Sequence, residues 1–426
     1  KSFFEVTQNF ISQEKILSYH DKSDGGLMTT LLESSFAGHV GIDIYYNQDI
    51  LDINKFMFNE ELGVVMQISN KFLAEVQTVY ESINVSNYVI AKINTSYDVN
   101  IYADKNLVYN NSLENLHKTW HRTSYEIQRI RDNSDTAEIE YDSIGKIEKK
   151  GLYIDKKFSD PDINKIFSIS KTKPKVAILR EQGINGHYEM ANAFSVNGFE
   201  AVDVTMNSLI AKENNLEDYQ GAVFCGGFSY GDVLGAGKGW ANKILHNELL
   251  LDSFSNYFNN LDKFVLGICN GCQALSNLQV IIPGSHHWPS FLQNNSERFE
   301  SRIVMVSIEK SNSIFLSGMN DSKLPIVISH GEGRAYLTEK DYMNLKDNNK
   351  VCMSYIDDSE EFSEIYPYNP NGSYMGVAGV SSSSGNVTLM MPHPERLMDI
   401  KQFPTNNNEK ISPWSKFFYN ARMHLK

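Results

Sequence analysis

The second half of the chain carries short, unbroken apolar runs that alternate with amphipathic stretches. These runs are Val176–Leu179, Phe199–Val204, Ala222–Cys225 and Phe264–Ile268. Strands that are buried on both faces have this pattern, because helices cover both sides of a parallel sheet. The pattern therefore predicts an α/β fold from Pro174 onward, with a mostly parallel sheet flanked by helices.

The first half mixes helical and strand-like periods and predicts an α+β subdomain. Helices are expected at Leu27–Ala37 and Phe72–Ile83, and strands at Val40–Tyr46, Gly63–Ser69 and Tyr88–Ile93. Asn111, with Glu114 three residues later, is typical of a helix N-cap with a reciprocal carboxylate. This pair predicts a long helix that begins there and ends near Asp132.

Between the two halves, the residues from Asp132 to Pro174 are rich in Asp, Lys and Ser and lack a clear period. This composition predicts a surface linker, with at most a short strand at Leu152–Ile154. We therefore expect a subdomain over residues 1–135, a linker over 136–173 and a second domain over 174–426.

The charge and composition exclude several classes of protein. Acidic residues outnumber basic ones 52 to 39, which gives a net charge of −13 and disfavours a nucleic-acid partner. No apolar stretch reaches the roughly 18 residues of a membrane helix, and the start does not resemble a secretory signal. Four cysteines in 426 residues do not form a disulfide scaffold, so we expect a cytoplasmic protein. The chain begins with Lys1 rather than Met, which suggests a piece of something larger.

The sharpest chemical signal directly follows the Phe264–Ile268 run. The segment Gly267–Gly271 has the Gly-x-Cys-x-Gly form of a nucleophile elbow, with Cys269 at its centre. The N-terminus of a following helix would lower the thiol pKa and stabilise an oxyanion. We therefore predict Cys269 as nucleophile and Asn270 as an oxyanion or substrate contact. A buried structural cysteine is the alternative, and Cys269 with Cys272 also has the spacing of a redox pair.

A histidine lies where a general base would be needed. His393 follows the apolar run Val387–Met391, stands between two prolines, and has Glu395 two residues later. A lone histidine is more often structural, but the presence of an elbow cysteine favours a base. Cys269, His393 and Glu395 would then act as nucleophile, base and orienting carboxylate.

The glycine-rich segment Gly226–Gly239 resembles a phosphate-binding loop only at first sight. A Walker A motif would need Gly at the position of Asp232 and Ser or Thr at that of Gly239. We predict instead that Gly226 and Gly227 offer main-chain N–H groups to an oxyanion near the elbow. A flexible connecting loop is the alternative.

A second polar segment lies near the start of the chain. Asp21, Ser23 and Asp24 precede two glycines and a predicted helix. Carboxylate oxygens bind Mg²⁺, and helix N-termini bind phosphate, so cation and phosphate chemistry both fit. An ordinary turn with a helix cap fits as well.

Taken together, these segments resemble the class I, triad-type glutaminase domain in the variant of the phosphoribosylformylglycinamidine synthases. The matching segments are Arg180–Asn185, Gly226–Gly239, Gly267–Gln273, Trp288-Pro289, Arg298–Glu300, His330–Arg334, Tyr366-Pro367, Asn369–Ser373, Pro392–Arg396 and Ser412–Trp414. The first half resembles the last synthetase subdomain of the large, single-chain form through His20–Gly26, Phe58–Gly63 and Gln128–Asn133. The resemblance spans nearly the whole chain and corresponds to the C-terminal third of that form.

The resemblance implies a glutamine-dependent amidotransferase of purine biosynthesis. Cys269 would hydrolyse glutamine through a γ-glutamyl thioester without a cofactor, with His393 as acid and base and Glu395 as its orienter. The ammonia would convert formylglycinamide ribonucleotide to the amidine with ATP and Mg²⁺. The implied partners are glutamine, formylglycinamide ribonucleotide and the N-terminal synthetase region of the same protein, so this chain alone is expected to support only the glutaminase step.

The resemblance also places Gln273 near the glutamine, and it makes Asp21 a Mg²⁺ ligand and Ser23 an ATP contact. Whether that nucleotide is the reacting or an auxiliary one stays open. Two other functions are also open: a stand-alone cysteine hydrolase for another amide or peptide, and a non-catalytic regulatory or assembly module. The segment Asp21–Gly26 disfavours the first, because a stand-alone hydrolase needs no ATP-linked subdomain, and the intact triad disfavours the second.

Overall fold

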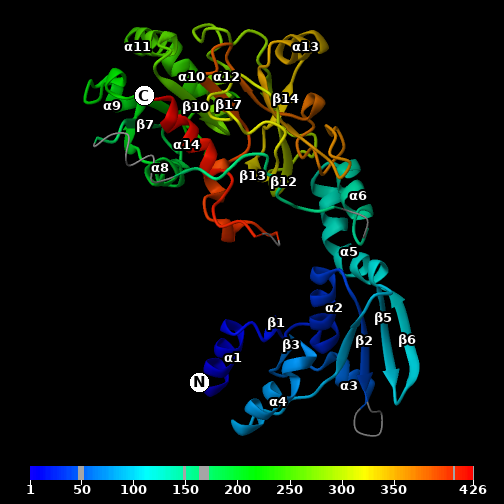
Figure 1. Cartoon of the computed structure of the whole chain (residues 1–426). Coiled ribbons are helices and arrows are strands. Elements are labelled where there is room, and N and C mark those ends of the chain that lie inside the picture. Colours follow the sequence, from blue (N-terminus) through cyan, green and yellow to red (C-terminus); the bar gives the residue numbers. More distant parts are fainter. Residues whose placement is uncertain (47–51, 147–149, 163–171, 406–407, 426) are drawn as a thin grey trace. The chain divides into compact units, whose positions relative to one another are not determined.

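The computed structural model describes residues 1–46, 52–146, 150–162, 172–405 and 408–425. The chain divides into two compact units (Figure 1). The first unit consists of Lys1–Gln128 and Glu140–Glu148, and the second of Arg129–Ile139 and Lys149–Lys426. The predicted domain limits at residues 135 and 173 stay a prediction.

The segment predicted as a linker contains a helix, α6 (Ser134–Asp142). The side chain of Asn133 caps this helix by accepting hydrogen bonds from the main-chain N–H groups of Asp135 and Thr136. The predicted strand at Leu152–Ile154 is wrong, because the only pairing described nearby is a single bridge between Asp155 and Lys323. Asn133 and the polar surface of α6 account for the first part of this polar segment.

In the first unit, one layer is a two-stranded antiparallel sheet of β1 (Ile16–Asp21) and β3 (Val64–Ile68). Helices α1 (Ser2–Ser12) and α4 (Leu73–Ser82) pack on it around a small apolar core. The buried members of this core are Phe10, Ile16, Val76 and Tyr80.

A second sheet of the first unit has its own core. Its strands are β2 (Gly41–Tyr46), β4 (Ala91–Asn94), β5 (Asp98–Ala103) and β6 (Asn106–Ser112), in the order β4-β2-β5-β6. The helices beside it are α2 (Gly26–Gly38), α3 (Ile53–Phe58) and α5 (Leu113–Arg131). The predicted cap of α5 is wrong: Asn111 lies in β6, and the Ser112 hydroxyl accepts the hydrogen bond from the Asn115 N–H at 3.2 Å.

The second unit is built on a nine-stranded sheet. Its parallel part contains β8 (Glu200–Thr205), β7 (Lys175–Arg180), β9 (Gly221–Phe224), β10 (Phe264–Ile268) and β17 (Val387–Met390), in this spatial order. Beyond β17 follow the antiparallel strands β16 (Val377–Ser381), β15 (Val351–Tyr355), β12 (Glu300–Ile308) and β13 (Lys323–His330). The predicted α/β class is confirmed, and so are the parallel strands read from the apolar runs.

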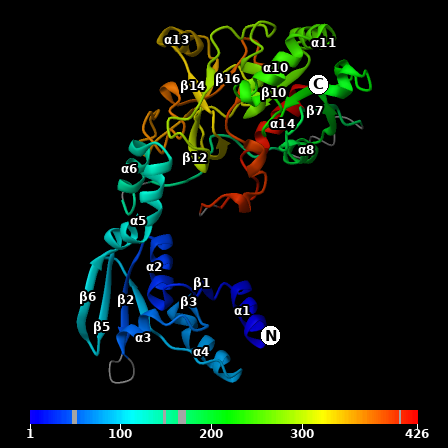
Figure 2. The same cartoon turned by 180° about the vertical axis from the view of Figure 1, so that it is seen from behind.

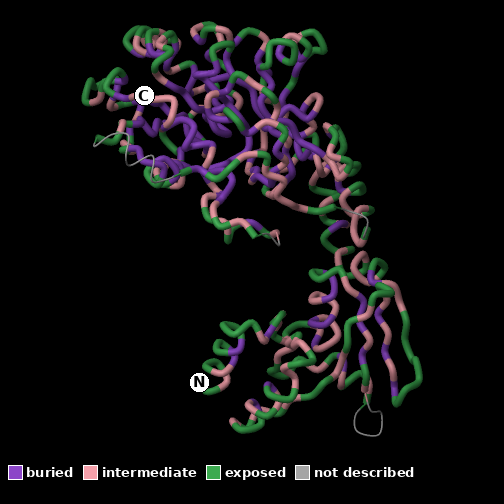
Figure 3. Tube along the Cα trace, viewed as in Figure 1, coloured by how far each residue is buried: buried purple, intermediate pink, exposed green. Residues whose placement is uncertain are grey.

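Helices cover both faces of the parallel strands (Figures 1 and 2). On one side lie α10 (Lys238–Leu245), α11 (Glu248–Asn259) and α12 (Asn270–Ser276), and on the other α8 (His187–Val196) and α14 (Ser415–His424). The remaining elements are α9 (Met206–Ile210), α13 (Glu339–Asp347) and a two-stranded sheet of β11 (Ser290–Leu292) and β14 (Arg334–Tyr336). Every residue of β9 and β10 is buried, and Figure 3 shows this dense interior. No helix in the described ranges is long and apolar enough to cross a membrane.

The parallel register determines where chemistry can occur in this unit. Strands β7, β9, β10 and β17 are neighbours and point the same way, so the loops that follow them emerge at one edge of the sheet. These loops begin at Glu181, Cys225, Cys269 and Met391. The predicted elbow, the glycine-rich loop and the predicted base therefore share one edge.

Candidate active site

Cys269 occupies a strained turn between β10 and α12. Its φ of 55° and ψ of −111° lie in a region that non-glycine residues rarely adopt, a strain of about 1–3 kcal/mol. The Cys269 N–H holds the turn by donating to the Met390 carbonyl at 3.0 Å. A Cβ atom on Gly271 would lie 2.0 Å from the Phe224 carbonyl oxygen, so only glycine lets the helix approach β9 this closely. The Gly-x-Cys-x-Gly segment thus forms the strand-to-helix turn that its pattern predicts.

His393 and Glu395 form a buried pair just beyond β17. The His393 Nδ1 and the Glu395 Oε1 are 2.6 Å apart, and both side chains are 1% exposed. The His393 N–H donates to the Val327 carbonyl at 2.8 Å, which fixes the backbone against β13. Because Glu395 binds Nδ1, the Nε2 atom is the ring nitrogen left for a reacting group, and it has no hydrogen-bond partner.

The elbow and the histidine meet at Gly226. A Cβ atom on Gly226 would lie 2.8 Å from the His393 Cε1 and 3.1 Å from the Cys269 Cβ. Burial lowers the pKa of His393, but the Glu395 carboxylate and the Cys269 thiol together raise this pKa to about 9. The imidazole is therefore protonated at neutral pH and can donate a proton from Nε2.

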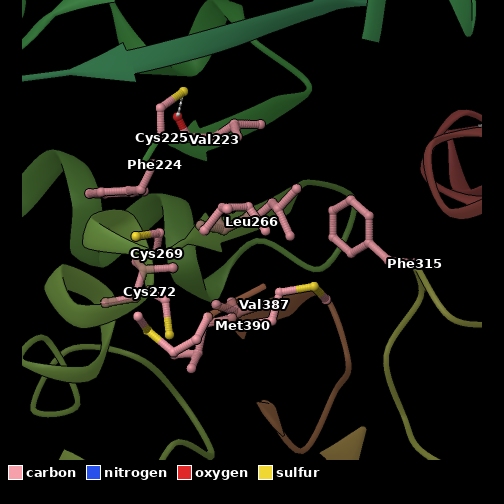
Figure 4. Close-up of a cluster of buried hydrophobic side chains, with 14 of the residues drawn as sticks. Val223, Phe224, Cys225, Leu266, Cys269, Cys272, Phe315, Val387 and Met390 are labelled. Atoms are coloured by element: carbon pink, nitrogen blue, oxygen red, sulfur yellow. Dashed lines mark hydrogen bonds between the residues drawn. The ribbon is translucent and has the colours of Figure 1, made fainter. Parts of the chain in front are cut away.

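The two cysteines of the Cys-x-x-Cys pattern have different environments (Figure 4). The Cys269 side chain is 7% exposed, and its thiol donates to the Ser329 carbonyl at 3.4 Å. Cys272 is fully buried, and burial raises its pKa well above the usual value. All four cysteines are free thiols. Cys272 is thus part of the core, whereas Cys269 borders the site.

The two predicted oxyanion glycines lie in contact with the loop that follows β7. The Gly226 carbonyl accepts a hydrogen bond from the Gly186 N–H at 3.0 Å. A Cβ atom on Gly227 would lie 2.8 Å from the main-chain nitrogen of Asn185. Gly226 is thus held beside Cys269 and Gly227 against Asn185, and the role of both glycines as oxyanion donors stays a prediction.

Asn270 and Gln273 have protein partners in the structure. The Asn270 Nδ2 donates to the Asp232 Oδ2 at 2.7 Å, while its Oδ1 is buried without a partner. The Gln273 Nε2 donates to the Glu332 carbonyl at 2.6 Å. Both side chains are therefore held by neighbouring loops, and their predicted contact with substrate stays a prediction.

Sequence reasoning gave no role to two groups beside the triad. His330, at the end of β13, is buried, and burial together with the nearby His393 lowers its pKa to about 3. It is therefore neutral at physiological pH. Glu189, on α8, lies with His393 and Glu395 in a cluster whose ligand atoms are all within 4.8 Å of one another. Of these two residues, only His330 lies in a segment that resembles the family, His330–Arg334.

Among the described residues, Glu189, His393 and Glu395 have ligand atoms close enough together to hold a metal ion. Some of the polar atoms in this cluster have protein partners: Glu189 accepts from the Arg396 Nε at 2.8 Å, and the His393 Nδ1 is bonded to the Glu395 Oε1. The His393 Nε2 and the Glu395 Oε2 have no hydrogen-bond partner.

Asp21 and Ser23 belong to the first unit, whereas the triad residues belong to the second. Asp21 ends β1 with a side chain that is 76% exposed, 4.0 Å from the His20 Nδ1. Helix α2 begins after Gly25, and no side chain caps it, so the alternative of Asp21 as a helix cap is wrong. The Mg²⁺ and ATP roles of Asp21 and Ser23 stay predictions.

Comparison with known proteins identifies a domain family over most of the second unit. Residues 173–425 match the family model of the CobB/CobQ-like glutamine amidotransferase domain. A structure of PurLQS from Thermotoga maritima is 27% identical and covers 60% of this chain and 100% of its own, with a TM-score of 0.46. A T. maritima glutamine amidotransferase is 16% identical over 53% of this chain and 77% of its own, with a TM-score of 0.31.

A second solved structure matches a smaller share of the chain. T. maritima PurL complexed with FGAR is 12% identical and covers 27% of this chain, with a TM-score of 0.25. The matched part is 20% of the length of that protein. Because the glutamine amidotransferase model matches residues 173–425, more than half of the chain, this chain belongs to the CobB/CobQ-like glutamine amidotransferase family.

Proposed function

We propose that this chain is the glutaminase part of a phosphoribosylformylglycinamidine synthase, with Cys269 as the nucleophile. The observation that carries the proposal is the elbow cysteine beside the buried His393–Glu395 pair, with Gly226 packed against both Cys269 and His393. Membership of a glutamine amidotransferase family supports glutamine as the substrate. The family-like segments of the first half support the synthase in particular.

The first half-reaction breaks the amide bond. The Cys269 thiolate attacks the δ-carbon of glutamine, and the developing oxyanion is stabilised by main-chain N–H groups near Asn270 and Gly227. When the tetrahedral intermediate collapses, the carbon–nitrogen bond breaks, and the Nε2–H of His393 gives its proton to the departing ammonia. The enzyme is left as a γ-glutamyl thioester with a neutral imidazole.

The second half-reaction returns the free enzyme. The neutral Nε2 of His393 takes a proton from water as the water attacks the thioester carbon. The carbon–sulfur bond then breaks, glutamate leaves, and the thiolate–imidazolium pair is restored. Glu395 stabilises the imidazolium form through its contact with Nδ1.

The ammonia would be used by the synthetase, which needs ATP and Mg²⁺ and converts formylglycinamide ribonucleotide to the amidine. In this proposal Asp21 contributes to Mg²⁺ binding and Ser23 to ATP binding, and the rest of the synthetase is the partner. A loop at the edge of the glutaminase site suits such a partner: Phe228, Tyr230, Val233 and Leu234 are between 62% and 94% exposed. Exposed apolar side chains grouped in one segment are typical of protein contact sites.

Covalent labelling tests the nucleophile. A diazoketone analogue of glutamine should label Cys269 and spare Cys272, because Cys272 is fully buried and its pKa is raised. Peptide mapping by mass spectrometry reads the site of labelling. Cys269→Ala should lose labelling and glutaminase activity, while Cys352→Ala, which removes another buried thiol, should keep both. Labelling mainly at Cys272, or full activity in Cys269→Ala, would overturn the proposal.

A further inference from the structure

Asp232, the residue that rules out a Walker A motif, lies at the centre of a hydrogen-bond hub in the loop after β9. Its Oδ1 accepts from the Ser229 hydroxyl at 2.7 Å and from the Gly237 N–H at 3.0 Å. Its Oδ2 accepts from the Ser229 N–H at 2.7 Å and from the Asn270 Nδ2 at 2.7 Å. One carboxylate thus holds both arms of the Gly226–Gly239 loop and the residue next to Cys269.

All acceptor positions of this carboxylate are in use. An ionised carboxylate offers about four lone-pair sites, and Asp232 receives four donors, two on each oxygen. A group saturated in this way has no site left for a substrate ammonium or a metal ion. The role of Asp232 is therefore mechanical, and it acts through Gly237 and Asn270.

The loop that Asp232 holds lies directly on the catalytic elbow. At one end, Gly226 touches Cys269 and His393. At the other end, a Cβ atom on Gly237 would lie 2.4 Å from the main-chain nitrogen of Ala274, so the loop packs on the backbone of α12. Any movement of the loop relative to α12 would change the distance between Gly226 and the thiol.

We propose that Asp232 is a positioning residue for the glutaminase reaction. It locks the Gly226–Gly239 loop to α12, so that the main-chain groups of Gly227 and Asn270 keep their places around the thiol. This inference rests on the proposed function, and it adds to it the residue that fixes the geometry of the oxyanion site. Interactions that position oxyanion donors act mainly in the transition state, so their loss lowers kcat more than it changes KM.

Replacement by Asn distinguishes charge from shape, because Asn has one acceptor oxygen and one donor nitrogen in nearly the same volume. With the nitrogen at the Oδ1 position, the Ser229 hydroxyl can turn and accept, but the Gly237 N–H faces a second donor. With the nitrogen at the Oδ2 position, the Asn270 amide can flip, because its Oδ1 has no partner, but the Ser229 N–H faces a second donor. Either orientation leaves one main-chain N–H without an acceptor.

The test compares Asp232→Asn, Ser229→Ala and the surface control Asp252→Asn in the full chain. Glutaminase kcat and KM are measured, together with the rate at which the diazoketone labels Cys269. Asp232→Asn should lower kcat and the labelling rate by about tenfold or more, with KM changed less than about threefold. Ser229→Ala removes one hydroxyl donor and keeps both main-chain bonds, so its loss should be smaller, and Asp252→Asn should match wild type.

Amide hydrogen exchange provides a readout that does not depend on activity. In Asp232→Asn, the peptide over residues 226–239 should exchange about tenfold faster, while β10 keeps the protection of wild type. Wild-type rates and wild-type exchange in Asp232→Asn would overturn this inference and leave the proposed function standing. A wild-type chain that neither hydrolyses glutamine nor is labelled would overturn the proposed function, and the exchange result would still decide the role of Asp232.

Discussion

The candidate residues of the two units have opposite environments. In the second unit, His393 and Glu395 are 1% exposed, bonded to each other and fixed by the backbone of β13 and β17. In the first unit, the Asp21 side chain is 76% exposed, and its Oδ1 lies 4.0 Å from the His20 Nδ1. The glutaminase site is therefore organised before substrate arrives. Around Asp21, by contrast, water and nucleotide phosphates would have to supply most of the ligands of a Mg²⁺ ion, as they commonly do.

Among the described residues, the second unit holds the titrating groups whose pKa values shift most. His330 and His393 are both buried, yet burial lowers the pKa of His330 to about 3 while Glu395 and Cys269 raise that of His393 to about 9. The difference is the carboxylate, which only His393 has as a partner within 2.6 Å. A buried site thus uses one charge to select which histidine carries the proton at neutral pH.

Removal of His393 should have the largest effect. It should impair glutamine hydrolysis while sparing synthesis from ammonia. His393→Ala loses the group that protonates the departing ammonia and activates water, so glutamine hydrolysis should fall by about 10²–10⁴-fold. In the complete synthetase, synthesis from a high concentration of ammonium salt should survive. An equal loss with glutamine and ammonia, measured as amidine formed, would show that His393 is structural or that the units are not an amidotransferase pair.

Glu395→Gln should have the next largest effect, and it should shift the pH at which activity is lost. The carboxylate raises the pKa of His393 against the lowering by burial, so its removal should lower that pKa from about 9. The imidazolium must donate a proton, so activity is lost as the pH rises through this pKa. The alkaline limb of the kcat profile should therefore shift to lower pH, with a loss of about 10²-fold at neutral pH. An unshifted alkaline limb would contradict the assigned charge pair.

The parallel core was predictable, because strands buried on both faces consist of unbroken apolar runs. Val176–Leu179 and Phe264–Ile268 lie in β7 and β10 as expected. The elbow was predictable for a related reason, since close backbone approach requires glycine at Gly271. Where the chemistry depends on the local chain alone, the sequence carries the signal.

The remaining features depend on contacts between distant segments, which a local pattern does not encode. The hydroxyl of Ser112 takes the place of Asn111 as the cap of α5, and the Asn111 Oδ1 accepts from the Ser112 N–H instead. The hub at Asp232 joins residues 38 positions apart, and the carbonyl that accepts from the Cys269 thiol is 60 positions away. The sequence shows no period that would bring such groups together.

A methyl group at Gly226 should test how tightly the site in the second unit is packed. Gly226→Ala would place a Cβ atom 2.8 Å from the His393 Cε1, so the imidazole or the loop must move. We expect kcat to fall about tenfold and stability to fall by about 1–3 kcal/mol, as in overpacked cores. Gly63→Ala is the matched control in the first unit, where the nearest atom is the flexible Lys22 Cε at 3.5 Å. If both variants match wild type in thermal unfolding and kcat, the inference that Gly226 is closely packed is wrong.

Asp21→Asn should have the smallest effect on glutamine hydrolysis. It tests the role of the exposed candidate residue in the first unit. Because no side chain caps α2, a change in stability from a lost cap is not expected, and any effect should come from the charge. Asn keeps the shape and one oxygen ligand but lacks the charge that attracts Mg²⁺. In the complete synthetase, Mg²⁺-dependent nucleotide binding should weaken and synthesis should fall with either nitrogen donor, while labelling of Cys269 stays at the wild-type rate. Titration of Mg²⁺ against nucleotide binding decides the role of Asp21: superimposable curves for wild type and Asp21→Asn would remove it from the metal site.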